Sequence, residues 1–330
     1  MSALIGAGAL WLALAIDARW GEPPARWHPV VGIGRYLGWA GARIAPVAGA
    51  GADVGTPDHR AFTLGALAWC AGALVMVALA WGLQGLLLDL ATRFPVCGTA
   101  LASVILGLVL KPLLAWRMLR DEVLAVEAAL EVSLAAGRER LSWLVSRDVA
   151  QLSASEVRES AIESLAENLN DSVVAPIFWF VLLGLPGAAL YRFANTADAM
   201  WGYRGLRNGR NWEWAGKWAA RADDVLSWVP ARLTALLLRG AGQRVPVAAL
   251  RREAAGTPSP NSGWPMAAMA LRLGVRLRKP GVYALNASGV APEASHTQRA
   301  VALATSAVWR CSVIATPVLL LSTIGCYRLF

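Results

Sequence analysis

The chain has 330 residues, of which 56% are hydrophobic, and its 31 Lys and Arg residues outnumber 22 Asp and Glu residues, giving a net charge of +9. A mean hydropathy of +0.46 is too high for an ordinary soluble domain and predicts a polytopic membrane protein. The sequence has no Lys-rich run, zinc-finger spacing or aromatic RNA-binding motif, so we exclude nucleic acid as a partner. Anionic membrane lipid and a phosphorylated small molecule explain the positive charge more simply.

In chain order, the apolar segments that predict membrane spans cover residues 3–16, 62–88, 94–110, 172–191 and 311–327. The second is the strongest, because it contains no charged residue and exceeds the ~20 residues that a helix needs to cross a bilayer. The first has no Lys or Arg before it, so we interpret it as a retained helix rather than a secretory signal.

Arginines concentrate in the connecting segments, which by the positive-inside tendency face the cytoplasm. If the segments on both sides of residues 172–191 lie on the same side of the membrane, that stretch is not a simple crossing. Pro176 and the Gly/Pro turn at residues 184–187 would let it form a re-entrant hairpin instead. We therefore expect an all-α fold, a polytopic integral membrane helical bundle with polar cytoplasmic segments, forming one membrane-embedded domain over residues 1–330.

A polar block at residues 163–171 (ESLAENLND) runs directly into the apolar stretch 172–191. Upstream of it, Ser153 with Glu156 three residues on forms a capping box, which predicts that a helix begins there. One face of this helix is apolar, and the opposite face carries Glu159, Glu163, Glu167 and Asn170.

Glu163 and Glu167 lie one helical turn apart, near enough to share a hard cation. Asn170 or Asp171 would supply further oxygen ligands, a set that suits Mg²⁺ bridging to a nucleotide phosphate. The alternative is a solvated acidic face. Proximity to a membrane segment favours the functional interpretation, since unpaired carboxylates are costly there.

Two further groups of polar side chains flank apolar segments. Asn195 and Asp198 are at helical spacing just after the predicted hairpin, and Asp223 and Asp224 follow downstream. Together with the block at residues 163–171 they could converge on one site. The alternative is that each is a helix cap or a salt-bridge partner.

Three other residues are candidates in irregular segments. His28 lies in a Pro/Gly-rich stretch and is either an acid–base group or a structural hydrogen bonder. Arg35 follows Gly-Ile-Gly and could bind a phosphate in bidentate fashion. Asn261 belongs to the turn SPNSGWP at residues 259–265, whose side chains bond either the local backbone or a ligand.

Taken together and in this order, several segments resemble the CobD/CbiB family of cobalamin biosynthesis, the adenosylcobinamide-phosphate synthases. They are GEPPARWHPVVGIGR, SRDVAQLS, the long motif from AIESLAENLNDSVVAP to NTADAMWGYR, WAARADDVLSWVPARL and SPNSGWPMAAMALRLGVRL. The resemblance covers nearly the whole chain, and the long central motif is highly specific.

The resemblance implies a multi-pass enzyme of the cell inner membrane whose active site faces the cytoplasm. Its reaction would join (R)-1-amino-2-propanol or its phosphate to a propionate side chain of adenosylcobyric acid, giving adenosylcobinamide or its phosphate. The family is described as ATP-dependent, and because a carboxylate resists attack by an amine, this suggests an acyl-phosphate intermediate. The implied partners are adenosylcobyric acid, aminopropanol or its phosphate, ATP with Mg²⁺, membrane lipid, and a second copy of the chain or other late-pathway membrane proteins.

With the resemblance, the candidate residues take three roles. The expected catalytic residues are Glu163, Glu167, His28 and Asp171. The residues expected to bind ATP are Arg35, Arg147, Asn168, Asn195 and Asn261. The expected Mg²⁺ ligands are Glu163, Glu167, Asp198, Asp223 and Asp224.

Two other functions fit parts of the pattern. An intramembrane prenyl-type transferase would also use Asn/Asp clusters to bind Mg²⁺ and a diphosphate, but the motifs around Arg35 and Asn261 have no evident place in that chemistry. A transporter or assembly scaffold could relay ions through buried carboxylates, yet the chain lacks paired broken helices in two matching halves.

Overall fold

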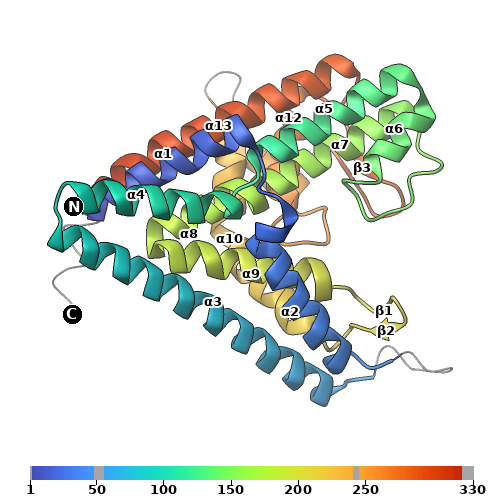
Figure 1. The fold of residues 1–330 in the computed structure, drawn as a ribbon. Helices are drawn as coiled ribbons and strands as arrows, with labels where there is room; N and C mark the ends of the chain where they lie inside the picture. Colours follow the sequence, from blue (N-terminus) through green and yellow to red (C-terminus); the bar gives the residue numbers. More distant parts are fainter. Residues whose placement is uncertain (1, 48–55, 241–244, 322–330) are drawn as a thin grey trace. The chain divides into compact units, whose positions relative to one another are not determined.

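The computed structural model describes residues 2–47, 56–240 and 245–321, and these are helical almost throughout (Figure 1). The chain divides into two compact units, each built from separated segments. The first contains Met1–Leu114, Pro176–Leu226 and Ala315–Phe330, and the second contains Ala115–Ala175 and Ser227–Ile314. The single domain expected over residues 1–330 stays a prediction, and the units are described one at a time.

The first unit is a set of packed helices with one short hairpin. Its elements are α1 (Ser2–Trp20), η1 (Ala25–Trp27), α2 (Pro29–Ile44), α3 (His59–Arg93), α4 (Cys97–Leu110), η2 (Lys111–Leu113), α8 (Ala175–Leu183), α9 (Leu185–Trp201), β1 (Leu206–Arg207), β2 (Arg210–Asn211) and the start of α10 (Lys217–Arg239). In this unit α1 packs on α4, α3 packs on α4 and α9, and α2 packs on α9.

Within the described residues, four helical stretches are long and apolar enough to cross a membrane: Ala3–Trp20, His59–Arg93, Cys97–Val132 and Ala294–Leu321. They confirm the all-α polytopic membrane fold and the spans predicted at residues 3–16, 62–88 and 94–110. The third extends past its predicted end because it also includes η2 and α5 (Trp116–Val132), although residues 114–115 between them are not helical. The fourth begins well before residue 311, and residues 322–327 of that predicted span lie outside the described residues.

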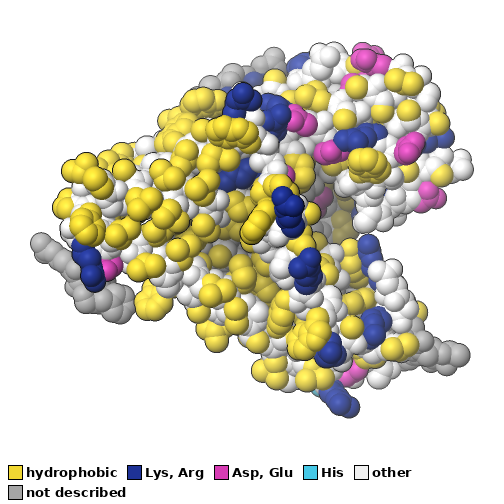
Figure 2. All heavy atoms as spheres, viewed as in Figure 1, with side chains coloured by type: hydrophobic (Ala, Val, Ile, Leu, Met, Phe, Trp, Pro, Cys, Tyr) yellow, Lys and Arg dark blue, Asp and Glu magenta, His cyan; other side chains and the backbone are white. Residues whose placement is uncertain are grey.

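Large apolar side chains cover the outer face of α3. Leu74, Leu79 and Leu86 are each about two thirds exposed, and Trp81 is 72% exposed. Figure 2 shows hydrophobic side chains over α3 and α4 with few charges among them. Soluble monomers rarely expose an apolar patch of this extent, so we assign this face to contact with lipid hydrocarbon.

The stretch predicted as a hairpin contains two helices, α8 and α9. The helix breaks at Gly184, whose φ of +69° favours glycine, and the side-chain oxygen of Gln84 accepts the backbone N–H of Leu185 at 2.7 Å. Gly187 lies so close to the carbonyl of Trp179 that a Cβ there would be 2.4 Å from it, so the two helices fold back on each other. The break is confirmed, and its depth in a membrane stays a prediction.

A buried ion-pair network connects the ends of α1 and α4. Lys111 Nζ lies 2.9 Å from Asp17 Oδ1 and 2.8 Å from Glu22 Oε1, and the side chains of Lys111 and Asp17 are almost fully buried. Loss of one partner in such a pair leaves an uncompensated charge, typically at a cost of about 3–5 kcal/mol. The network therefore fixes how α1 and α4 meet.

The second unit holds the polar helix predicted from the capping box. Its elements are α5 (Trp116–Val132), α6 (Leu134–Leu141), α7 (Ala154–Leu169), the π-helix η3 (Asn170–Val174), the rest of α10, α11 (Val247–Ala254), α12 (Gly263–Leu273), β3 (Leu277–Lys279), β4 (Tyr283–Leu285) and most of α13 (Ala294–Leu321). Helix α7 is central in this unit, since it packs against α5, α6, α12 and β3.

Gly65→Ala and Gly82→Ala form a matched pair within α3. A Cβ at Gly65 would lie 2.1 Å from the carbonyl oxygen of Ala215, whereas nothing lies within 4 Å of a Cβ at Gly82. We expect Gly65→Ala to lower the thermal unfolding midpoint in detergent. Gly82→Ala should leave it unchanged or raise it slightly, because Ala is favoured over Gly in a helix by about 0.5–1 kcal/mol. Equal midpoints for the two variants would contradict the close approach of α3 to Ala215.

Candidate functional site

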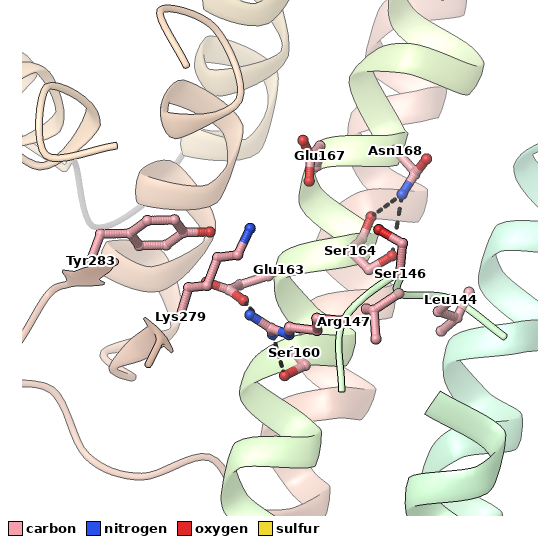
Figure 3. A pocket seen from close by; sticks show the side chains of 11 residues that line it. Leu144, Ser146, Arg147, Ser160, Glu163, Ser164, Glu167, Asn168, Lys279 and Tyr283 are labelled. Atoms are coloured by element: carbon pink, nitrogen blue, oxygen red, sulfur yellow. Dashed lines mark hydrogen bonds and ion pairs between the residues drawn. The ribbon is translucent and has the colours of Figure 1, made fainter. Parts of the chain in front are cut away.

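A polar pocket in the second unit gathers side chains from three separate segments (Figure 3). The loop after α6 supplies residues 144–147, including Arg147. Helix α7 supplies Ser160, Glu163, Ser164, Glu167 and Asn168, and the β3–β4 hairpin supplies Lys279 and Tyr283.

The start of α7 sets which of its side chains face the pocket. Ser153 caps the helix through its hydroxyl, which accepts the N–H of Glu156, while Glu156 Oε2 accepts the N–H of Ser153 at 2.8 Å. Hydrogen bonds from Ser153 hold the pKa of Glu156 below its ordinary value. The capping box predicted from sequence is therefore confirmed, and Glu163 and Glu167 follow on one face of the helix at the expected spacing.

The acidic face of α7 divides into an anchoring part and a pocket part. Glu159 is fully buried and pairs with Arg278 (Nε to Oε2, 3.1 Å) and Arg276 (Nε to Oε1, 3.8 Å). One turn later Glu163 is also buried, whereas Glu167 is exposed. The alternative of a wholly solvated acidic face is therefore wrong for the first two carboxylates.

The centre of the pocket is an ion pair between Glu163 and Arg147. Arg147 Nη2 donates to Glu163 Oε2 at 3.1 Å and also to the Ser160 hydroxyl. Burial raises the pKa of Glu163 despite the attraction of Arg147. Burial, together with the carboxylates of Glu163 and Glu167, also raises the pKa of Tyr283, so its hydroxyl stays a proton donor.

Two buried polar atoms of the pocket have no hydrogen-bond partner among the described residues. Glu163 Oε1 and Arg147 Nε are both fully enclosed, and neither has a hydrogen-bond partner of good geometry in the part of the chain that the structure describes. Buried polar atoms are normally paired, so an acceptor and a donor left open side by side are typical of a ligand site.

The carboxylates of the pocket are enough for Mg²⁺ only if the substrate and water supply most of its ligands. Within residues 2–47, 56–240 and 245–321, no three His, Cys, Asp or Glu side chains gather in a way that would hold a metal. Mg²⁺ in phosphate-transfer sites usually needs only one or two carboxylates, and its other ligands are water and phosphate oxygens. Glu163, whose buried Oε1 has no hydrogen-bond partner among the described residues, and Glu167 are the two carboxylates that could meet that requirement. Asp198, Asp223 and Asp224 belong to the first unit, and their role as ligands stays a prediction.

Two other predicted residues of the second unit make internal contacts outside the pocket lining. Asp171 lies in η3 and accepts a hydrogen bond from Asn170 Nδ2 at 2.7 Å, while Asn170 Oδ1 accepts one from Thr234. Asn261 Oδ1 accepts from Arg232 Nη1 at 3.1 Å. These contacts connect α10 to η3 and to the SPNSGWP turn.

In the first unit, His28 has a structural role. Its Nδ1 accepts the N–H of Val30 at the start of α2, and its Nε2 lies 3.0 Å from Glu22 Oε2. The accepting Nδ1 requires the proton to be on Nε2, so the ring is fixed as one neutral tautomer. The structural alternative for His28 is thus confirmed, and its catalytic role stays a prediction.

The remaining predicted residues of the first unit lie on helices. Arg35 is exposed on α2, and Asn195 and Asp198 are half-buried on α9. Asp223 and Asp224 are half-buried on α10, where burial raises the pKa of Asp224. Their roles in binding stay predictions.

Lys279 and Tyr283 were not predicted as site residues. The available signal was the Pro280-Gly281 dipeptide, which is typical of a turn, between an alternating stretch at residues 275–279 and an apolar stretch at residues 282–285. No sequence feature indicates that this hairpin packs on α7, about 120 residues earlier, because that contact depends on the pairing of Glu159 with Arg278.

Glu163→Gln tests the burial of the central carboxylate through the pH dependence of stability. Because folding raises the pKa of Glu163, its contribution to stability is complete below the ordinary value of 4.5 and is lost as the pH rises above it. The glutamine does not ionise, so we expect the thermal unfolding midpoint of the variant to gain on that of the wild type as the pH rises above 4.5. A midpoint difference that stays constant over this range would contradict the raised pKa.

Comparisons with known proteins agree with the family resemblance of the motifs. The family model for CobD/Cbib protein matches residues 10–308. A probable cobalamin biosynthesis protein CobD of Methanothermobacter thermautotrophicus is 39% identical over 282 residues, covering 84% of this chain and 85% of the relative. The cobalamin biosynthesis protein CobD of Chromobacterium violaceum is 42% identical over 272 residues, covering 81% and 79%. No solved structure matches. The chain is therefore a member of the CobD/CbiB family of cobalamin biosynthesis proteins.

Proposed function

We propose that the protein is an ATP-dependent amide-forming ligase of cobalamin biosynthesis. It joins (R)-1-amino-2-propanol or its phosphate to the propionate side chain of adenosylcobyric acid, and gives adenosylcobinamide or its phosphate. The observation that carries the proposal is the pocket on α7, where the Arg147–Glu163 pair, Glu167 and Lys279 meet in one unit of a membrane protein of this family.

The reaction requires activation of a poor electrophile. In the proposed first step a propionate oxygen attacks the terminal phosphorus of ATP, ADP leaves, and an acyl phosphate forms. In the second step the amine nitrogen attacks the acyl carbon, inorganic phosphate leaves, and the nitrogen gives up protons as the amide forms. The chain must therefore neutralise phosphate charge, exclude water from the acyl phosphate and accept a proton.

The pocket residues suit these tasks. Arg147 lines the pocket, and its guanidinium, whose Nε–H is buried without a partner among the described residues, can bind a phosphate oxygen. Glu167 is the exposed carboxylate of the pocket and can accept the proton that an ammonium group must lose before it attacks. Mg²⁺, when bound, would neutralise phosphate charge, and Glu163 and Glu167 are the residues that would hold it.

We further propose that the protein lies in the cell inner membrane with this pocket facing the cytoplasm. Arg138, Arg140, Arg147 and Arg158 lie on or near α6 and α7, and basic segments are retained on the cytoplasmic side. ATP is supplied from that side, so the proposed chemistry requires the same orientation.

Labelling of Ser146→Cys tests this orientation. Ser146 is exposed at the pocket. Cys70 and Cys97, which are exposed, and Cys326, which lies outside the described residues, would first be replaced. We expect an impermeant maleimide to label the variant in inside-out vesicles and to leave it unlabelled in right-side-out vesicles. The reverse pattern would place the pocket on the opposite side and exclude cytoplasmic ATP as its ligand.

Glu167→Gln tests the reaction. Purified protein would be reconstituted with adenosylcobyric acid, aminopropanol phosphate or free aminopropanol, ATP and Mg²⁺, and the amide product measured by mass spectrometry. Loss of the proton acceptor should reduce turnover by about 10²-fold or more without unfolding the protein.

Glu131→Gln provides the matched control, because Glu131 is an exposed carboxylate on α5 in the same unit and does not line the pocket. This variant should retain wild-type turnover. Wild-type rates for Glu167→Gln would remove that residue from the site. Folded wild-type protein that forms no amide product would overturn the ligase proposal and favour a transporter or scaffold.

A further inference from the structure

The β3–β4 hairpin brings the side chain of Lys279 to the pocket, and this side chain takes no part in the ion pairs described above. The chain has only three lysines, Lys111, Lys217 and Lys279. Lys111 is buried between Asp17 and Glu22, and Lys217 Nζ lies 3.6 Å from the ring centroid of Trp214. Lys279 lines the pocket and is exposed, and its side chain makes no hydrogen bond or ion pair with any residue that the structure describes.

The hairpin holds Lys279 in place by its turn and its ladder. Lys279 pairs with Tyr283 across the strands, and the N–H of Val282 donates to the carbonyl of Lys279 at 2.9 Å. Pro280 and Gly281, with a φ of +73° at the glycine, occupy the two central positions of the turn, as a type II turn requires. The backbone of Lys279 is therefore fixed, although its side chain is exposed.

The hairpin is in turn fixed to α7. Arg278, the neighbour of Lys279, bonds both oxygens of Glu159, at 3.1 Å from Nε to Oε2 and 3.2 Å from Nη2 to Oε1. Glu159 precedes Glu163 by one helical turn, so the anchor and the pocket lie next to each other on the same helix. The spacing between Lys279 and Glu163 is thus set by a bidentate ion pair with a fully buried carboxylate.

Around Lys279 the pocket presents further hydrogen-bond donors. Figure 3 shows Lys279 and Tyr283 on one side and Arg147 on the other, with their polar ends toward the space beside Glu163. Arg147 keeps its buried Nε–H without a partner among the described residues. Such donors bind anionic groups, and a phosphate, with several acceptor oxygens and a double negative charge, can use more of them at once than a carboxylate can.

We propose that Lys279 and Arg147 form a phosphate-binding subsite in the α7 pocket. The inference rests on the proposed ligase function for the identity of the two phosphate-bearing ligands, the nucleotide and the phosphorylated amino alcohol. In this proposal, the hairpin binds the phosphate group of one of these two ligands.

Binding of each ligand to the full-length protein in nanodiscs, measured by isothermal titration calorimetry, tests the subsite without turnover. The probes are Mg-ADP, (R)-1-amino-2-propanol phosphate and free (R)-1-amino-2-propanol. Loss of one charge-assisted contact in Lys279→Ala should weaken binding of one phosphate-bearing probe by about tenfold or more and leave the free amino alcohol unaffected. The probe that weakens identifies the source of the phosphate.

Two variants control the measurement. Lys279→Arg keeps a cation on the hairpin and should recover most of the lost affinity. Arg252→Ala removes a charge from a side chain on α11 that is 77% exposed and outside the pocket, so it should bind all probes as the wild type does. Unchanged thermal unfolding midpoints would exclude misfolding as the cause of any loss.

The outcomes for the subsite and for the ligase function are separable. Wild-type affinity of Lys279→Ala for both phosphate-bearing probes would overturn the subsite even if the wild type forms amide. The same result follows if neither probe binds the folded wild type. A selective loss of binding in Lys279→Ala, with no amide formed by the wild type, would support the subsite and reject the ligase function. Equal weakening of the free amino alcohol would also overturn the subsite, because the contact would then not involve phosphate.

Discussion

The arrangement of the segments in the second unit depends on ion pairs, because a buried carboxylate needs a cationic partner. Glu159 and Glu163 on α7, and Glu127 on α5, are all nearly inaccessible to solvent. Each is paired with an arginine from another segment: Arg278 of the hairpin, Arg147 of the loop after α6, and Arg158 of α7, whose Nη2 lies 2.6 Å from Glu127 Oε1. Replacing such pairs with apolar residues is often neutral for stability, so their benefit here is positional: they determine which segments meet at the pocket.

Sequence reasoning succeeded where the signal was local. The capping box at Ser153 predicted the start of α7, and the helical period then placed Glu163 and Glu167 on one face. The break at Gly184 followed from the turn residues, and the spans followed from long uncharged segments. Each of these features is decided by residues within a few turns of one another, so the sequence alone contains enough information.

Sequence reasoning failed where contacts join distant segments. Lys279 and Tyr283 reach the pocket only because a hairpin far along the chain packs on α7, and no periodicity encodes that contact. A different limit applies to His28 and Asn261. Their side chains suit both ligand binding and local structure, and only the positions of Val30 and Arg232 show the structural hydrogen bonds that they make. Family motifs identified these residues as notable but did not separate binding from architecture.

The anchor of the hairpin at Glu159 and the exposed amine of Lys279 respond differently to ionic strength. Counterions have little access to a fully enclosed carboxylate, so added salt hardly weakens the pairing of Glu159 with Arg278. The field of the exposed Lys279 amine, in contrast, is screened within a Debye length of about 8 Å at physiological salt. At high salt the hairpin therefore keeps its position, while the long-range attraction of Lys279 for an anion becomes weaker. Added salt should thus slow the binding of charged molecules without loosening the pocket.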